Sequence, residues 1–132
     1  TYPMTFTSLL VTNPIVVNQN GSFSFVVIGI GETTVPIVQG AVLHYYPLID
    51  GILPLTGYRD KVDFCQMLNN SNGPCPISGS FNVNATITHP PNSTYLPGIY
   101  SFLNGAIIRA EVNNPDNTNL TCVQGQINII SS

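Results

Sequence analysis

The stretch CPISGSFNVNATITHPPNSTYLPGIY, residues 75–100, decides the fold class because it opens with a regular alternation of apolar and polar residues. One side of an extended chain would carry Phe81, Val83, Ala85 and Ile87, and the other side the asparagines and threonines between them. Successive side chains of a β-strand point to opposite faces, so the alternation predicts a strand with one buried and one solvated face. The proline-rich HPPNSTYLPG that follows predicts a loop.

The rest of the chain repeats this pattern of short strands and turns. Further strands are predicted at residues 4–11, 22–30, 37–46, 99–112 and 120–130, and the strand described above spans 79–88. The apolar PLIDGILPL (47–55) continues the pattern beyond residue 46 through a glycine bend. GIGETTVP (29–36) predicts a turn or kink, and the asparagine-rich segment between Cys65 and Cys75 predicts a loop. No segment combines a helical apolar stripe with capping residues. Seven or eight strands with a turn about every ten residues indicate an all-β antiparallel sandwich or barrel.

Length and composition indicate one domain, residues 1–132, with a polar but weakly charged surface. Charged residues make up only 7% of the chain, well below the roughly 25% of an average domain. Asn-x-Ser/Thr sequons offer another source of surface polarity, because each can accept a glycan in the secretory pathway. If the chain enters that pathway, we expect a secreted glycoprotein, either extracellular or in a vacuole-like or lysosome-like lumen; the plainer alternative is that an asparagine-rich chain contains sequons by chance. The candidate glycosylation sites are Asn20, Asn69, Asn84, Asn92 and Asn119.

The charge distribution argues against a nucleic-acid partner. Arg59, Lys61 and Arg109 are the only basic residues besides two histidines, and the net charge is −3. Binding to a phosphate backbone requires a basic surface. No run of about eighteen apolar residues is present, so no membrane-spanning helix is predicted.

The three cysteines leave one residue without an evident partner. Cys65 and Cys75 are ten residues apart, and a disulfide between them could close the segment that they flank. Cys122 would then be left over; its partner could lie upstream of Thr1, or it could be a buried free thiol. No C-x-x-C pair or histidine-rich segment is present, so we expect no metal and no other cofactor.

A specific order of motifs extends through most of the chain. DFC (63–65) is followed by CPISG (75–79), an alternating strand, LPGIY (96–100) and LTC (120–122). In this order the chain, over about residues 4–130, resembles the ML lipid-recognition domain family. Within that family it looks most similar to the fungal phosphatidylglycerol/phosphatidylinositol transfer proteins and to the Niemann-Pick type C cholesterol carrier.

The resemblance implies an immunoglobulin-like sandwich of two antiparallel sheets that part to form an apolar cavity for a lipid. It implies a Cys65–Cys75 disulfide, and it pairs Cys122 with a cysteine a few residues before Met4, where this sequence has none. It also places residues 89–98 at the mouth of the cavity. The residues expected to line the cavity are Phe25, Val42, Phe81, Val83, Ile87, Leu96, Tyr100 and Phe102.

The function that the resemblance implies is lipid binding and transfer. A sterol or phospholipid would be held between the sheets and exchanged with membranes through transient contact, and we expect the carrier to be a monomer. The residues that could meet a lipid headgroup are His44, Tyr58, Arg59 and Lys61. A plainer alternative is that this segment pairs its own charges in solvent, because Asp60 and Asp63 lie among its cations. Arg109 and Glu111, two apart on one predicted strand, are expected to form an exposed pair.

An adhesion or recognition module and an enzyme are the two alternative classes of function. Phe81, Val83 and Ile87 could fill an ordinary core, in which case the chain would be an immunoglobulin-like adhesion or recognition module. Such a module would bind protein or carbohydrate through its loops and exposed tyrosines. An enzyme is not expected, because His44 and His89 are the only histidines and no G-x-S-x-G nucleophile motif is present.

Overall fold

Ten strands and one helix are formed by the residues that the structure, a computed structural model, describes: 2–12, 14–49, 52–54, 60–89, 107–126 and 129–131. In chain order they are β1 (Met4–Val11), β2 (Ile15–Val17), β3 (Phe23–Ile37), β4 (Val42–Ile49), β5 (Leu53–Pro54), β6 (Asp60–Asp63), α1 (Phe64–Asn72), β7 (Ile77–His89), β8 (Ile107–Asn113), β9 (Asn119–Gln126) and β10 (Ile129–Ser131).

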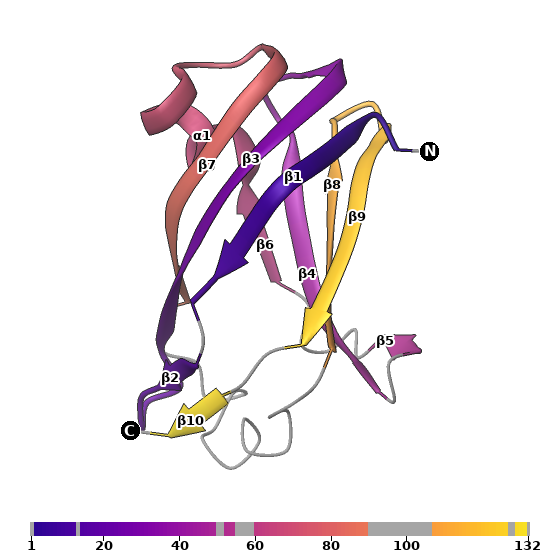
Figure 1. Cartoon of the computed structure of the whole chain (residues 1–132). Coiled ribbons are helices and arrows are strands. Elements are labelled where there is room, and N and C mark those ends of the chain that lie inside the picture. The colour runs from indigo at the N-terminus through magenta and orange to yellow at the C-terminus, as the bar shows by residue number, and fades with distance from the viewer. Residues whose placement is uncertain are drawn as a thin grey trace.

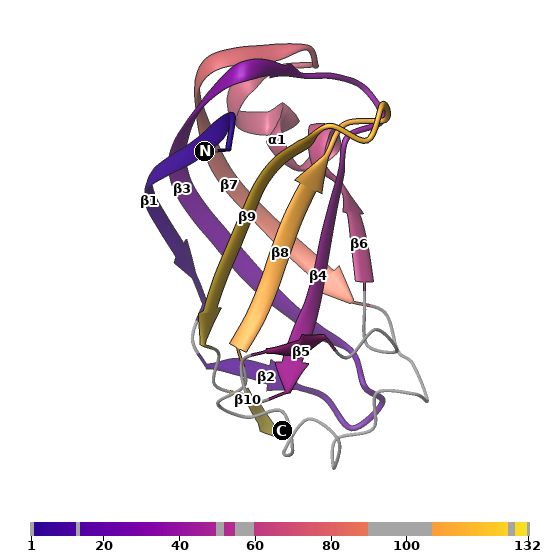
Figure 2. The ribbon, with the colours of Figure 1, turned by 90° about the vertical axis from the view of Figure 1, so that its right-hand side faces the viewer.

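The strands form two sheets that lie face to face (Figures 1 and 2). In the first sheet β3 lies between β1 and β7, while β2 pairs with the start of β3. In the second sheet β4 lies between β6 and β8, β9 pairs with β8, and β5 pairs with the far end of β4. These pairs are antiparallel, and β10 alone pairs in parallel, with β2. The predicted all-β sandwich of two sheets is thereby confirmed.

The alternation that decided the fold class governs the pairing of β3 with β7. Phe25 lies opposite Ile87, and Gly31 lies opposite Phe81. These residues and the odd-numbered positions between them face the second sheet, and most of them are buried. Asn82, Asn84 and Thr86 of β7 are exposed on the other face. The two-residue period of the sequence thus appears directly as one dry and one wet face.

Two strand boundaries differ from the prediction. β3 continues through residues 29–36, which were predicted as a turn or kink, and only its register with β7 shifts between Thr33 and Ile37. The next strand begins at Val42 instead of residue 37, because a tight turn intervenes. In that turn the Ala41 amide donates to the Val38 carbonyl (3.0 Å), and Gly40 has a φ of +95°, a conformation that favours glycine.

The segment between the two cysteines is a helix, so the prediction of a loop there was wrong. Asp63 caps the N-terminus of α1 by accepting a hydrogen bond from the Gln66 amide (3.2 Å), and Gly73 ends the helix with a φ of +80°. Phe64, Cys65 and Leu68 are buried on its inner face. Capping and burial of one face outweigh the weak helix propensity of its asparagines. Within the described residues, no helix is long and apolar enough to span a membrane.

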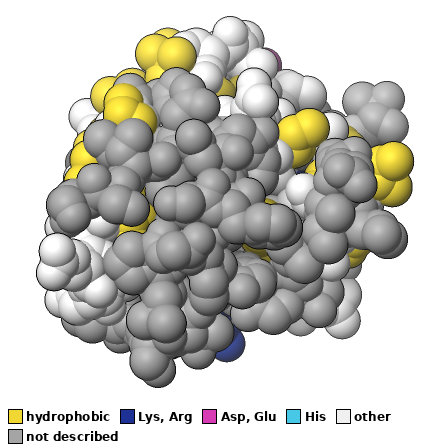
Figure 3. Space-filling view, turned by 90° about the horizontal axis from the view of Figure 1, so that it is seen from below, with side chains coloured by type: hydrophobic (Ala, Val, Ile, Leu, Met, Phe, Trp, Pro, Cys, Tyr) yellow, Lys and Arg dark blue, Asp and Glu magenta, His cyan; other side chains and the backbone are white. Residues whose placement is uncertain are grey.

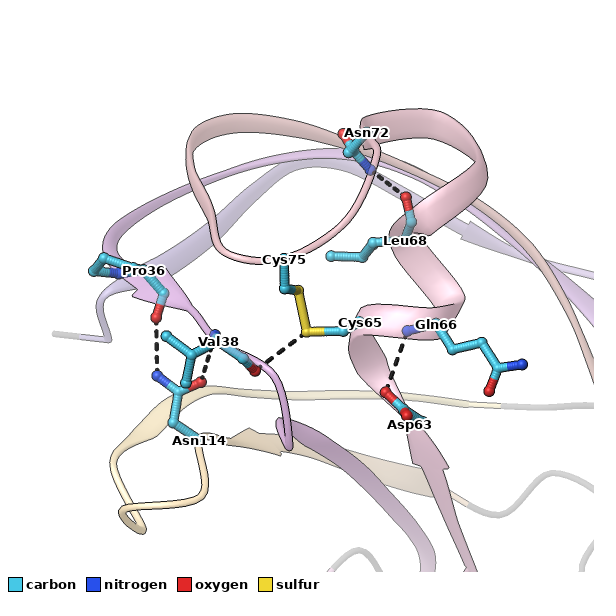
Figure 4. Close-up of a disulfide and its surroundings, with 9 residues drawn as sticks. All are labelled: Pro36, Val38, Asp63, Cys65, Gln66, Leu68, Asn72, Cys75 and Asn114. Carbon is cyan, nitrogen blue, oxygen red and sulfur yellow. Dashed lines mark hydrogen bonds between the residues drawn. A yellow bond between two sulfur atoms is a disulfide. The ribbon is translucent and has the colours of Figure 1, made fainter.

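The predicted disulfide fixes α1 against the sheets. Cys65, in the first turn of the helix, is bonded to Cys75, which lies between the helix and β7 (Figure 4). At the same end of the molecule the buried side chain of Asn114 joins the β8–β9 turn to the chain that leaves β3. It donates to the Pro36 carbonyl (2.9 Å) and accepts from the Val38 amide (3.2 Å). This end of the sandwich is therefore closed by covalent and polar contacts.

We predict that Gly31→Ala destabilises the protein by overpacking. A Cβ at this position would lie 2.6 Å from the ring of Phe81 and 3.1 Å from that of Phe6. Phe81 is only 2% exposed and cannot move aside easily. We expect a loss of about 1–3 kcal/mol in the free energy of unfolding, measured by urea denaturation. Gly125→Ala, whose added Cβ would meet nothing within 4 Å, is the control; equal losses in the two variants would contradict the packing argument.

Candidate functional site

A cavity of about 420 Å³ lies between the two sheets. One wall is formed by side chains of the first sheet, from β1, β3 and β7: Phe6, Phe23, Phe25, Val27, Val83 and Ile87. The opposite wall is formed by the second sheet, from β4, β8 and β9: Leu43, Tyr45, Pro47, Ile108, Ala110, Val112, Thr121 and Val123. Phe64 and Met67 of α1 also line the cavity. Its volume is in the range of sites that bury small organic ligands.

The chemistry of the wall is almost entirely apolar. Among the described residues that line it, none carries a charge, and the polar side chains are those of Tyr45, two threonines and two glutamines. Nor do the described ranges contain a group of three or more His, Cys, Asp or Glu residues that could hold a metal ion. A ligand would therefore be held mainly by burial of its own apolar surface.

One edge of the sandwich is closed by a polar cluster. The carboxylate of Asp60, at the start of β6, accepts from the Tyr45 hydroxyl (2.9 Å) and lies 2.6 Å from Nδ1 of His89, at the end of β7. Phe23 stacks on the His89 ring with centroids 4.7 Å apart, and Phe25 meets Tyr45 edge to face at 6.0 Å. The cluster joins the first sheet to the second where β6 and β7 come together (Figure 2). We call Tyr45, Asp60 and His89 the edge clamp.

The hydrogen bonds of the edge clamp favour the ionised form of Asp60. Partial burial acts to raise the pKa of this carboxyl group. Hydrogen bonds from the Lys61 amide, from Tyr45 and from His89 outweigh burial, and the pKa is lowered below its ordinary value. The Asp60 carboxylate therefore stays charged, and stays a good acceptor, in mildly acidic solution.

The opposite edge of the sandwich is where the cavity reaches the surface. Here the lining comes from the ends of β1 and β9, residues 9–12 and 124–126. Leu9 is 36% exposed and Val11 41% exposed, although both line the cavity. β1 and β9 are edge strands of different sheets, and they diverge toward this end of the molecule (Figure 1). In the view of that end, hydrophobic side chains are spread around the described surface, while charged ones show only at its margin (Figure 3).

A profile of the ML domain matches residues 1–129. The chain belongs to the ML domain family. No curated protein matches this sequence.

Solved structures agree with the fold of an ML domain. A Niemann-Pick type C2 protein from the Japanese carpenter ant superposes with a TM-score of 0.58 at 11% identity, over 95% of this chain and 91% of that one. The immunoglobulin-like two-sheet fold expected from the sequence is therefore confirmed. A CARDB domain from Pyrococcus furiosus, solved with di-metal ions, gives a TM-score of only 0.41 at 13% identity over 96% of both chains, which is too low to bear on function.

Three of the residues predicted to line the cavity of this ML domain are found in its wall: Phe25, Val83 and Ile87. Phe81 is not among the lining residues; it lies beside them in the core, with its ring edge to face with Phe6 at 5.9 Å. Val42 is not in the wall either, because Leu43, the next residue of β4, faces the cavity. His89, the first residue of the predicted mouth loop, is buried at the end of β7 in the edge clamp. Leu96, Tyr100, Phe102 and the rest of that loop, residues 90–98, lie outside the described residues.

The two described residues suggested for a headgroup, His44 and Lys61, are not part of the cavity wall. His44 and Lys61 lie opposite each other in the β4–β6 pair, and neither lines the cavity. The alternation of β4 explains this, because Leu43 and Tyr45 on either side of His44 face inward. Tyr58 and Arg59 lie outside the described residues.

Several residues of the cavity wall were not predicted from the sequence. Those of β4 and β8 are Leu43, Tyr45, Pro47, Ile108, Ala110 and Val112. Their signal was present, because every second residue of VLHYYPLI and IIRAEVN faces inward, but the neighbouring positions are also partly apolar and obscure the period. The sequence shows Asp60 only as a charge near Arg59 and Lys61, and it does not indicate the contacts of Asp60 with Tyr45 and His89.

The predicted pairing of Arg109 with Glu111 is replaced by contacts to neighbouring strands. The Tyr46 hydroxyl donates to Oε1 of Glu111 (3.2 Å), and the Arg109 guanidinium donates to Oε1 of Gln124 (3.4 Å). Burial raises the pKa of Tyr46, and Glu111 adds to the effect. Cys122, next to this network on β9, is a half-buried free thiol.

We predict that the edge clamp makes stability depend on pH in the acid range. The pKa of Asp60 is lower in the folded than in the unfolded chain, so its stabilising effect is complete above the unfolded value of about 3.9. The effect is lost as pH falls through the lower, folded value. Asp60→Asn should remove this component and flatten the pH dependence.

Urea unfolding measured from about pH 6 down to about pH 2 tests this expectation. Asp116→Asn is the matched control, because the pKa of Asp116 is also lowered, but by hydrogen bonds from Thr118 within the same exposed turn and not by a contact between the sheets. An Asp60→Asn variant with the same acid dependence as the parent would show that the clamp does not contribute in this way.

Proposed function

We propose that this ML domain is a secreted or lumenal lipid carrier that holds a sterol or phospholipid between its sheets and exchanges it with membranes. The observation that carries the proposal is the apolar cavity, whose described wall contains no charged side chain. The membership in the ML family and the fold shared with a Niemann-Pick type C2 protein support it. We further propose that the chain acts as a monomer and performs no catalysis.

The energetics of such a cavity suit exchange. Each CH₂ group that leaves water gains ~0.8 kcal/mol, whether it enters a bilayer or an apolar protein cavity. Transfer between the two environments is then nearly balanced, whereas the free lipid in water is strongly disfavoured. We propose that the lipid enters at the apolar opening between β1 and β9, at Leu9 and Val11.

An uncharged buried portion of the ligand follows from the same wall. A charge inside would be desolvated without a partner of opposite sign among the described lining residues. The acyl chains of a phospholipid or the ring system of a sterol satisfy this condition. A charged headgroup would have to remain at the opening, in contact with water.

Secretion and glycosylation form a second part of the proposal. Four of the five sequon asparagines, Asn20, Asn69, Asn84 and Asn119, are exposed in the structure, so an oligosaccharide can be attached to each without disturbing the core. Asn92 lies outside the described residues. The low charge of the chain and its disulfide are consistent with an oxidising, glycosylating compartment.

The direct test is native mass spectrometry of the protein made in a secretory host, followed by lipid analysis of what co-purifies. We expect one lipid per chain, and the lipid analysis would decide between sterol and phospholipid. Protein that is empty and takes up neither class from vesicles would refute the carrier function. The alternative of an adhesion or recognition module that binds protein or carbohydrate would then be the better account.

We also predict that a bulkier side chain in the cavity wall weakens lipid binding while the fold is kept. Ala110→Leu adds bulk to a half-buried wall position and would displace about two methylenes of ligand. At ~0.8 kcal/mol each, this lowers affinity about tenfold. Titration with a fluorescent sterol and a fluorescent acyl probe measures it. Ser78→Leu, which places the same side chain at an exposed position of β7, should bind like the parent; a parallel loss in both variants would point away from the cavity.

A further inference from the structure

The outer face of the first sheet carries apolar side chains that no described element covers. Ile28 is 49% exposed, Ile30 is 52% exposed and Leu10 is 67% exposed. Leu10 lies directly opposite Ile28 in the β1–β3 pair, so the two share a face. Single exposed apolar residues are ordinary, but neighbouring ones form a patch that needs an explanation. We call Leu10, Ile28 and Ile30 the outer patch.

A glycosylation sequon lies at the border of the outer patch. Asn84 of β7 is directly opposite Ile28 in the β3–β7 pair and is exposed. Thr86, which completes the sequon Asn84-Ala85-Thr86, is also exposed on this face. Side chains directly opposite each other on neighbouring strands have Cβ atoms about 5 Å apart. A group attached to Asn84 would therefore begin within contact distance of Ile28.

Asn84 also lies on the unpaired edge of β7. The side chain of Asn72, at the end of α1, bonds both backbone groups of Asn82: it donates to the carbonyl (2.7 Å) and accepts from the amide (2.9 Å). The backbone of Asn82 therefore points away from β3, and by the two-residue period so does that of Asn84. Within the described residues no strand pairs with β7 on this side.

An unpaired strand edge invites pairing with another chain, and proteins usually protect such edges with charged residues or proline. β7, ISGSFNVNATITH, contains no lysine, arginine, acidic residue or proline. The hydrogen bonds of Asn72 occupy the backbone groups of this edge at Asn82. The next outward-pointing position along the strand is Asn84, where the sequence offers a sequon instead of a charge.

We propose that Asn84 carries an N-linked glycan that covers Ile28 and Ile30 and blocks the free edge of β7. A glycan is bulky and hydrophilic, so at this position it shields the apolar patch and excludes a second chain from the strand edge. The inference rests on the secretory location proposed above, but not on lipid binding. The other described sequons are differently placed; Asn20, for example, lies in a tight turn where its Oδ1 accepts from the Ser22 hydroxyl (2.6 Å).

The test uses the full chain secreted from a eukaryotic host, with glycopeptide mapping and size-exclusion chromatography with light scattering. We expect a glycan at Asn84 and a monomeric parent protein. Asn84→Gln and Thr86→Ala remove the same sequon in different ways, and both should lose one glycan mass and show a several-fold larger associated fraction. Asn119→Gln, at another exposed sequon, should not increase association.

A rescue variant separates shielding from an unspecific effect of losing a glycan. Adding Ile28→Thr and Ile30→Thr to Asn84→Gln should restore the monomer, because the outer patch is then polar. An unmodified Asn84 in protein glycosylated elsewhere, or an absence of glycans altogether, would overturn the proposal. So would an Asn84→Gln variant that stays monomeric, or one that associates equally with and without the threonines. Lipid loading of Asn84→Gln should equal that of the parent, because Asn84 does not line the cavity.

Discussion

The two sheets of this protein have to stay apart although their facing surfaces are apolar. An unfilled space between such surfaces is unfavourable, because protein interiors normally pack as densely as organic crystals and lose dispersion contacts at every void. The cavity of about 420 Å³ therefore depends on contacts at the periphery that fix the separation of the sheets. These contacts are unevenly distributed, and their distribution explains both the shape of the cavity and the position of its opening.

One end and one edge of the sandwich are secured. At the end, the Cys65–Cys75 disulfide holds α1 against the sheets, and Asn114 ties the β8–β9 turn to the chain leaving β3. At the edge, the carboxylate of Asp60 draws Tyr45 and His89 together across the two sheets. Because the remaining edge, between β1 and β9, lacks such a cluster among the described residues, it is where the apolar wall becomes exposed. The cavity therefore opens at the edge where no such cluster of described residues joins the two sheets.

The sequence predicted the parts of this arrangement that depend on local order. The alternation at Phe81, Val83 and Ile87 identified β7 and its inward face, and the motif order led to the family and the disulfide. The helix was not predicted because asparagine and serine occupy its last four positions, residues 69–72, although its capping residues Asp63 and Gly73 are present in the sequence. In that case tertiary burial of Phe64 and Leu68 overrode a weak local propensity.

Contacts between residues that are far apart in the sequence could not be predicted from local patterns. Asp60 and His89 are 29 residues apart, and nothing near either residue in the sequence signals that they meet. The distinction between cavity wall and filled core is equally invisible. Phe81 and Val83 share one face of one strand, yet Val83 lines the cavity while Phe81 packs against Phe6 and Gly31. Position along the sheet separates the two residues, and their periodicity is the same.

The outer and inner faces of the first sheet pose one physical problem in two forms. Inside, apolar side chains such as Val83 and Ile87 need a ligand or a partner surface to complete their contacts. Outside, Ile28 and Ile30 are apolar and lie next to a strand edge without charges. A chain with only 7% charged residues cannot solve either problem with ion pairs. A lipid inside and a glycan outside would each supply what the sequence omits, and both are molecules that a secretory compartment provides. Under the proposed secretory location, the scarcity of charge would be compensated by a polar surface that is completed only after synthesis.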